Sequence, residues 1–155
     1  MTNPILHAGM GHTANTVFNP GASLLADGSV TLLCRVEDRA GHSHLTAARS
    51  ADGISNWAID TSPTLSGDGT PEERFGIEDP GRITRLDDGR YAAASRPSAK
   101  PALRLPRDDF RLRHLRPPRH HPPAQQQRRR VFPTKVAGQY AILHRPSCPD
   151  AGGGI

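Results

Sequence analysis

Aromatic and other apolar side chains are scarce in this sequence. Aromatic residues make up 5% of it and hydrophobic residues 35%, both low for a chain that packs a large core. No run is long and apolar enough to cross a membrane, and the N-terminus lacks the charged-then-apolar pattern of a signal peptide. From 155 residues we expect one domain of ordinary size, in the cytoplasm and without a membrane partner.

Cysteine is scarce as well. Cys34 and Cys148 have no metal-ligand spacing, and in a reducing compartment they are expected to be unpaired thiols rather than a disulfide. His42 and His44 share one face of an expected strand, but no carboxylate or third histidine completes a metal site at a suitable spacing. We therefore expect neither a metal nor an organic cofactor.

Turn-forming residues, by contrast, are abundant, with 15 glycines and 15 prolines, and they mark a repeat. Asn19-Pro20 and Asp79-Pro80 are each followed by a leucine and an Asp-Gly turn, and Phe132-Pro133 opens a third copy. The prolines are 60 and 53 residues apart, a period typical of a multi-strand unit such as a propeller blade. Because no window shows the apolar spacing of an amphipathic helix, we predict an all-β fold.

Basic charge is concentrated in residues 92–130. This segment holds ten arginines and Lys100 against two aspartates, a charge of +9, so that the rest of the chain carries −4. Its seven prolines argue against strands, because proline cannot donate to a strand ladder. Three interpretations remain open: a basic arm for nucleic acid, a disordered linker, and a stretch translated out of frame, which we favour. The predicted organisation is completed by N-terminal blades at 1–91, the remnant of a third blade at 131–148 and a tail at 149–155.

Three segments carry a family resemblance. They are VFNPGASLLADGSVTLLCRVEDRAGHSHLTAARSADGISNW at 17–57, RFGIEDPGRITRLDDGRY at 74–91 and VFPTKVAGQYAILHRP at 131–146. In this order they resemble glycoside hydrolase family 130, the β-mannoside phosphorylases and related mannosidases, whose signature is a Gly-x-Glu-Asp-Pro-Arg string. The resemblance covers about half of the chain and implies a partial five-bladed β-propeller of about two and a half blades.

The sequence departs from the family in several places. Gly81 separates Pro80 from Arg82, whereas the family has arginine directly after proline. The strands expected after Tyr91 are replaced by the Pro/Arg segment, and the last two blades are absent. We therefore expect an incomplete copy of the enzyme that is inactive as written.

The resemblance assigns a carboxylic acid to the reaction. Cleavage of a glycoside needs an acid to protonate the leaving oxygen, and Asp79 matches the family's acid, which passes its proton through a sugar hydroxyl. Glu78 is expected to orient the sugar or Arg82. Without the family context, the favoured reading of Asp79 is a cap of the turn before Pro80.

Sugar-binding residues are also implied. Asn19 and Arg35 match positions that contact the mannose in the −1 subsite, and Glu37 lies on the same strand face as Arg35. Their alternatives are a turn-forming asparagine and an exposed strand arginine. Trp57 suits either a sugar ring or the core.

A phosphorylase also needs cations that hold phosphate on the opposite face of the sugar. Lys135 matches a phosphate-contacting lysine, with Arg82 and Arg145 as further candidates and a solvated lysine as the alternative reading. The expected substrates are a mannoside oligosaccharide and inorganic phosphate as co-substrate, giving mannose 1-phosphate. The alternatives are a β-mannoside hydrolase of the same family and a basic nucleic-acid-binding protein, although nucleic acid is not the partner we expect. Homo-oligomers are compatible with the full-length family.

Overall fold

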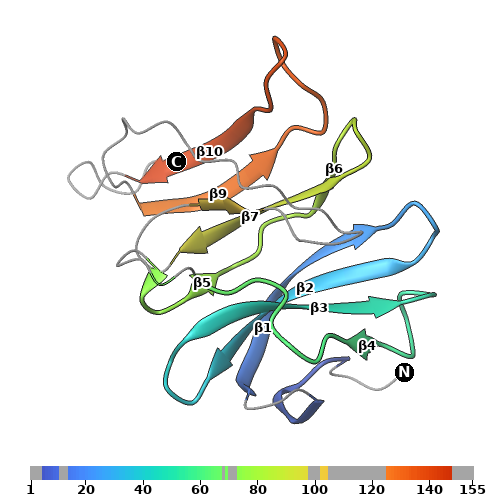
Figure 1. Cartoon of the computed structure of the whole chain (residues 1–155), viewed down its shortest axis with the longest axis vertical. Coiled ribbons are helices and arrows are strands. Elements are labelled where there is room, and N and C mark those ends of the chain that lie inside the picture. Colours follow the sequence, from blue (N-terminus) through green and yellow to red (C-terminus); the bar gives the residue numbers. More distant parts are fainter. Residues whose placement is uncertain are drawn as a thin grey trace.

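Figure 1 shows the computed structural model of the chain, in which strands form two sheets and a separate hairpin. The structure describes residues 5–10, 14–67, 69, 73–97, 102–104 and 125–147. Apart from a 3-10 turn at Ala8–Met10, every regular element in these ranges is a strand, so the predicted all-β class is confirmed. Among the same residues, no helix has the length and apolar character that a membrane span requires.

The first sheet is antiparallel and has the order β1-β2-β3-β4, which is consistent with a propeller blade. Its strands are β1 (Ala14–Leu24), β2 (Val30–Asp38), β3 (Ser43–Ser50) and β4 (Ala58–Ile59). The predicted turn at Asp27-Gly28 joins β1 to β2, and Gly28 adopts a φ of 86° there. The pairing of β1 with β2 shifts register between Phe18 and Gly21, so Asn19 and Pro20 bulge out of the ladder.

The second sheet is interrupted at the corresponding place. β5 (Ile77–Glu78) and β6 (Thr84–Arg85) pair with opposite ends of β7 (Tyr91–Pro97), and β8 (Ala102–Arg104) pairs with its middle. The break between β5 and β6 contains Asp79-Pro80, the repeat partner of Asn19-Pro20. The remaining two strands, β9 (Gln125–Val131) and β10 (Ile142–Ser147), pair with each other. We call this pair the third hairpin, because it contains the third copy of the repeat.

Residues 92–130 contain strands, although the prolines of this segment argued against strands there. β7 runs across the predicted boundary at residue 91 as far as Pro97, and β8 and most of β9 also lie within the segment. Ala92 and Ala93 explain the continuation, because these small side chains are buried to 0% and 1% exposure in the core. Proline enters β7 only at its last residue, where it interrupts no further ladder bond. Residues 105–124, on which the three interpretations mainly rest, lie outside the described ranges.

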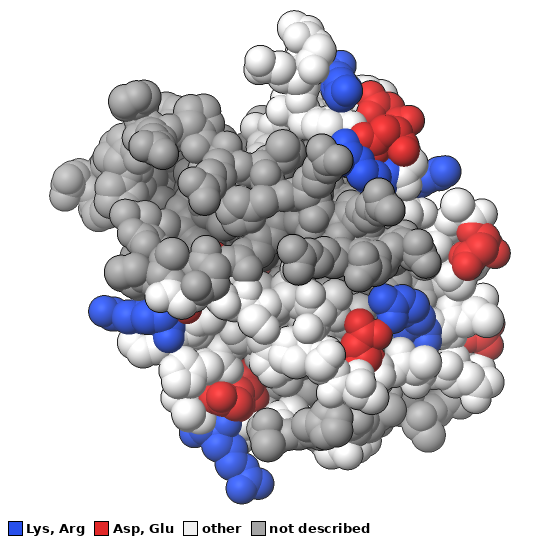
Figure 2. Space-filling view, viewed as in Figure 1, with Lys and Arg blue, Asp and Glu red and all other residues white. Residues whose placement is uncertain are grey.

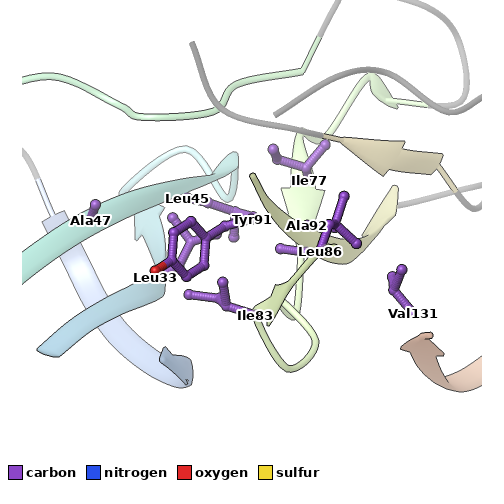
Figure 3. Close-up of a cluster of buried hydrophobic side chains, with 10 residues drawn as sticks. Leu33, Leu45, Ala47, Ile77, Ile83, Leu86, Tyr91, Ala92 and Val131 are labelled. Atoms are coloured by element: carbon purple, nitrogen blue, oxygen red, sulfur yellow. The ribbon is translucent and has the colours of Figure 1, made fainter. Parts of the chain in front are cut away.

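The hydrophobic core lies between the two sheets. Leu33 and Leu45 of the first sheet pack against Ile77, Ile83 and residues of β7, and Val131 closes the cluster from the third hairpin. Figure 3 shows the Tyr91 ring beside Leu33 and Leu45 in this layer. The Tyr91 hydroxyl also accepts a 3.0 Å hydrogen bond from the backbone N–H of Ala26, which fixes the β1–β2 turn to the second sheet.

Glycine allows the two sheets to approach each other closely. Ser43 of β3 donates its backbone N–H to the Phe75 carbonyl at 2.9 Å, and it forms a parallel bridge with Gly76. A Cβ at Gly76 would overlap the Ser43 carbonyl oxygen and lie 2.7 Å from its carbon, and the φ of +89° is itself unfavourable for other residues. Since Gly76 directly precedes β5, this contact sets where Glu78 and Asp79 meet the first sheet.

We predict that Gly76→Ala lowers the free energy of unfolding by more than about 3 kcal/mol, because backbone strain adds to overpacking. Gly89→Ala is the matched control, since its φ is +81° but nothing lies within 4 Å of the added Cβ. The control should lose only about 1 kcal/mol. Urea unfolding of both variants measures the difference, and equal losses would contradict the close approach described for Gly76.

Candidate functional site

Arg35 lies at the centre of the polar groups between the sheets. It belongs to β2, its side chain is 14% exposed, and its guanidinium lies 3.2 Å from a Glu37 oxygen. Across the sheet boundary it lies 3.2 Å from Glu78 and 3.5 Å from Asp79. One arginine therefore contacts three carboxylates, two of which come from the other sheet.

Two groups that sequence reasoning missed orient this arginine. The Arg35 Nε donates to the Ser43 Oγ at 3.0 Å, and the guanidinium lies 4.5 Å from the centre of the Phe18 ring. In the sheet register Ser43 is opposite Glu37 and Phe18 is opposite Arg35. The two strand pairings are the signal that would have revealed them, because cross-strand partners share a face.

Asn19 completes the cluster through Asp79. Its side-chain Nδ2 donates to Asp79 Oδ1 at 2.7 Å, so equivalent residues of the two repeats touch each other. Both have positive φ, 49° for Asn19 and 42° for Asp79, and both precede proline. Such backbone conformations are unfavourable outside glycine and concentrate at functional sites.

The cluster carries an excess of negative charge and an open side. Three carboxyl groups face one guanidinium, and Asp79 is the most accessible of them, at 40% side-chain exposure against 20% for Glu78. A half-exposed carboxyl group beside an amide and an arginine offers both donors and acceptors to a ligand rich in hydroxyl groups. The arrangement suits binding a sugar and presenting it with an acid.

The predicted phosphate-binding residues lie elsewhere. Arg82 is exposed and lines a separate hollow. The Lys135 backbone N–H donates to Asp87 at 3.4 Å and its ammonium lies 5.3 Å from the Tyr140 ring. Arg145 pairs with Arg128 in the β9–β10 ladder, and its side chain lies outside the described part. Among the described residues, no ion pair or hydrogen bond joins Arg82 or Lys135 to the Arg35 cluster.

Tyr140 anchors the third hairpin. Its hydroxyl lies 2.8 Å from carboxylate oxygens of both Asp87 and Asp88, on the β6–β7 turn. Burial and these two carboxylates raise the pKa of Tyr140 to about 12. The backbone N–H of Asp87 also donates to the Pro133 carbonyl at 2.9 Å. These contacts connect the hairpin that carries Lys135 to the second sheet.

Two of the remaining candidates face the other side of the first sheet. Cys34 and His44 line a cavity of about 230 Å³, where burial raises the pKa of the Cys34 thiol to about 11 and lowers the pKa of His44. His42 lies 3.7 Å from Asp38. Within the described residues no three metal-ligating side chains come together. Trp57 is partly buried, and its indole N–H has no hydrogen-bond partner.

The comparisons with known proteins point to carbohydrate chemistry. No family model matches the chain, and a search of curated proteins found no match. Among solved structures the chain is similar to a glycosyl hydrolase from Bacteroides ovatus, with 27% sequence identity and a TM-score of 0.53. The similarity covers 66% of this chain and 34% of the other, so the chain matches about a third of that enzyme's length. The fold is therefore that of part of a glycosyl hydrolase.

We predict that Arg35→Met destabilises the chain by about 2–4 kcal/mol, because it leaves three carboxylates facing one another in a half-buried site. Arg49→Met is the control, since Arg49 pairs with Asp60 on the same sheet at 39% exposure and should lose about 1 kcal/mol or less.

The double variant Arg35→Met/Glu78→Gln should recover part of the loss, because it removes one of the repelling charges. Urea unfolding of the single and double variants measures this coupling. Strictly additive losses would show that Arg35 and Glu78 do not interact.

Proposed function

We propose that the chain carries the sugar-binding part and the acid of an inverting glycoside phosphorylase of family 130. In this proposal the substrate is a β-1,4-linked mannoside, and the products are mannose 1-phosphate and the shortened saccharide. The observation that carries the proposal is the contact of Asn19 and Arg35 with Asp79, because it joins the expected sugar ligands to the expected acid.

Each residue has a defined task. Asn19 and Arg35 hydrogen-bond the mannose hydroxyls, and Asp79 delivers a proton toward the leaving oxygen by way of a sugar hydroxyl. Glu37 and Glu78 hold Arg35 in place through ion pairs of 3.2 Å. The positive φ of Asn19 and Asp79 fixes both side chains before the sugar arrives.

The ion pairs of the other two carboxylates, Glu37 and Glu78, favour phosphorolysis over hydrolysis. An inverting hydrolase needs a second carboxylate as a base that activates water. Glu37 and Glu78 both form ion pairs with Arg35, and we assign them to holding that arginine rather than to activating water. Phosphate is already an anionic nucleophile and requires only cations, for which Lys135, Arg82 and Arg145 are the candidates.

Binding can be tested with the chain itself. We expect β-1,4-mannobiose to shift the amide resonances of residues 17–22, 35–43 and 76–81, because these backbones carry the cluster. Arg35→Met and Asn19→Ala should abolish the shifts, whereas Asp79→Asn should retain them because the amide still accepts from Asn19. Loss of binding in the control Arg49→Met, or unchanged binding in Arg35→Met, would contradict this assignment.

Catalysis can be tested in a chimera that adds the remaining part of the matching glycosyl hydrolase. Mannobiose cleavage should then require added phosphate, and Asp79→Asn should lower the rate by about 10²–10⁴-fold, the usual contribution of a general acid. Lys135→Ala should raise the phosphate concentration needed for half-maximal rate. Release of free mannose at full rate without phosphate would identify a hydrolase instead.

A further inference from the structure

A second site lies near the Arg35 cluster along the same strands. It is a hollow of about 770 Å³ formed by the end of β1, by β6 and by the third hairpin. We call it the basic hollow, because three arginines line it: Arg82, Arg85 and Arg130. Arg82 is three residues beyond Asp79, so their Cα atoms are at most about 11 Å apart.

The three arginines of the basic hollow have no acidic counterpart. All are exposed, and none forms an ion pair with a carboxylate in the part of the chain that the structure describes. Figure 2 shows basic and acidic side chains interspersed on one face of the molecule. Three arginines that line one hollow concentrate positive charge there, which favours an anion in it. Arginine is also the side chain best suited to grip carboxylate, sulfate or phosphate by paired hydrogen bonds.

The rest of the lining is apolar and accessible. Leu24 is 68% exposed, Leu143 is 61% exposed and Phe132 is 42% exposed, and all three line the hollow. Its volume falls in the range of sites that hold a whole small ligand and is far larger than a single inorganic phosphate ion. A sugar ring has an apolar face that packs on such side chains, just as it packs on aromatic residues at sugar sites.

We infer that the basic hollow binds the negatively charged units of an acidic oligosaccharide, whose neighbouring unit enters the Arg35 cluster. This inference rests on the proposed sugar-binding role of that cluster and adds the charge of the substrate to it. Arg85 and Arg130, which the sequence did not single out, determine the preference for charged over neutral saccharides.

A matched pair of ligands tests the inference on the intact chain. A trisaccharide of β-1,4-linked mannuronate differs from β-1,4-mannotriose only in its carboxylates. Titration calorimetry should show at least about tenfold tighter binding of the mannuronate, with the difference shrinking as salt is added. Arg85→Gln and Arg130→Gln should each weaken mannuronate binding by about tenfold and leave mannotriose binding unchanged.

Arg39→Gln is the control variant, since Arg39 is exposed in the β2–β3 turn and does not line the hollow. It removes the same charge and should leave both affinities unchanged. Equal weakening by Arg39→Gln, or mannuronate binding no tighter than mannotriose, would overturn the inference. If the mannuronate binds no more tightly than mannotriose, but mannotriose binding still requires Arg35, the proposed function stands.

A nucleic acid is the competing occupant, and an oligothymidine of equal charge serves as its probe. We expect it to bind more weakly than the mannuronate trisaccharide at the same ionic strength. If it binds more tightly, and Arg85→Gln and Arg130→Gln weaken it most, the hollow is a nucleic-acid site and the inference is wrong. If neither trisaccharide binds, both the inference and the proposed function are overturned.

Discussion

The guanidinium of Arg35 is the group on which the polar half of this structure depends. It is the one described cation that contacts Glu37, Glu78 and Asp79, and two of these carboxylates belong to the opposite sheet. Below it, the apolar layer from Leu33 to Tyr91 holds the sheets together by burial. The apolar layer supplies the attraction, but it is non-directional, whereas the arginine requires its partners at defined positions. The site and the sheet interface are thus stabilised by the same side chain.

The close backbone contact at Ser43 and Gly76 supports this arrangement from the side. Because no side chain separates the two backbones, the start of β5 is fixed relative to β3 with little freedom. Ser43 takes part twice, with its backbone in the parallel bridge and with its hydroxyl as acceptor for Arg35. A small displacement of β5 would therefore change the contacts of Glu78 and Asp79 with Arg35 at the same time.

Much of the architecture could be predicted from the sequence. Asp-Gly turns beside apolar runs indicated β1, β2 and the β6–β7 hairpin, and the Asn-Pro and Asp-Pro repeat indicated two equivalent units. The five residues expected around the sugar, Asn19, Arg35, Glu37, Glu78 and Asp79, lie within one set of contacts. Their chemical roles, the family and the number of blades stay predictions.

The remaining features depend on information that sequence patterns do not carry. β7 continues through Ala92 and Ala93 because tertiary burial, not propensity, favours a strand there. Ser43 and Phe18 became visible only once the register of β1, β2 and β3 was known. The basic hollow brings together three segments of the chain, so no local spacing of arginines could have revealed it.

The meeting of Asn19 with Asp79 has a consequence for the symmetry of the repeat. Asn19 and Asp79 occupy the same position in the two copies of the repeat. Each has a left-handed backbone conformation and is followed by a proline. Two aspartates there would face each other as like charges, and two asparagines would contain no acid. An amide opposite a carboxylate resolves this, because one side chain donates and the other accepts. The repeat is thus symmetric in its backbone and asymmetric in its chemistry, and this single difference decides which of the two units can release a proton.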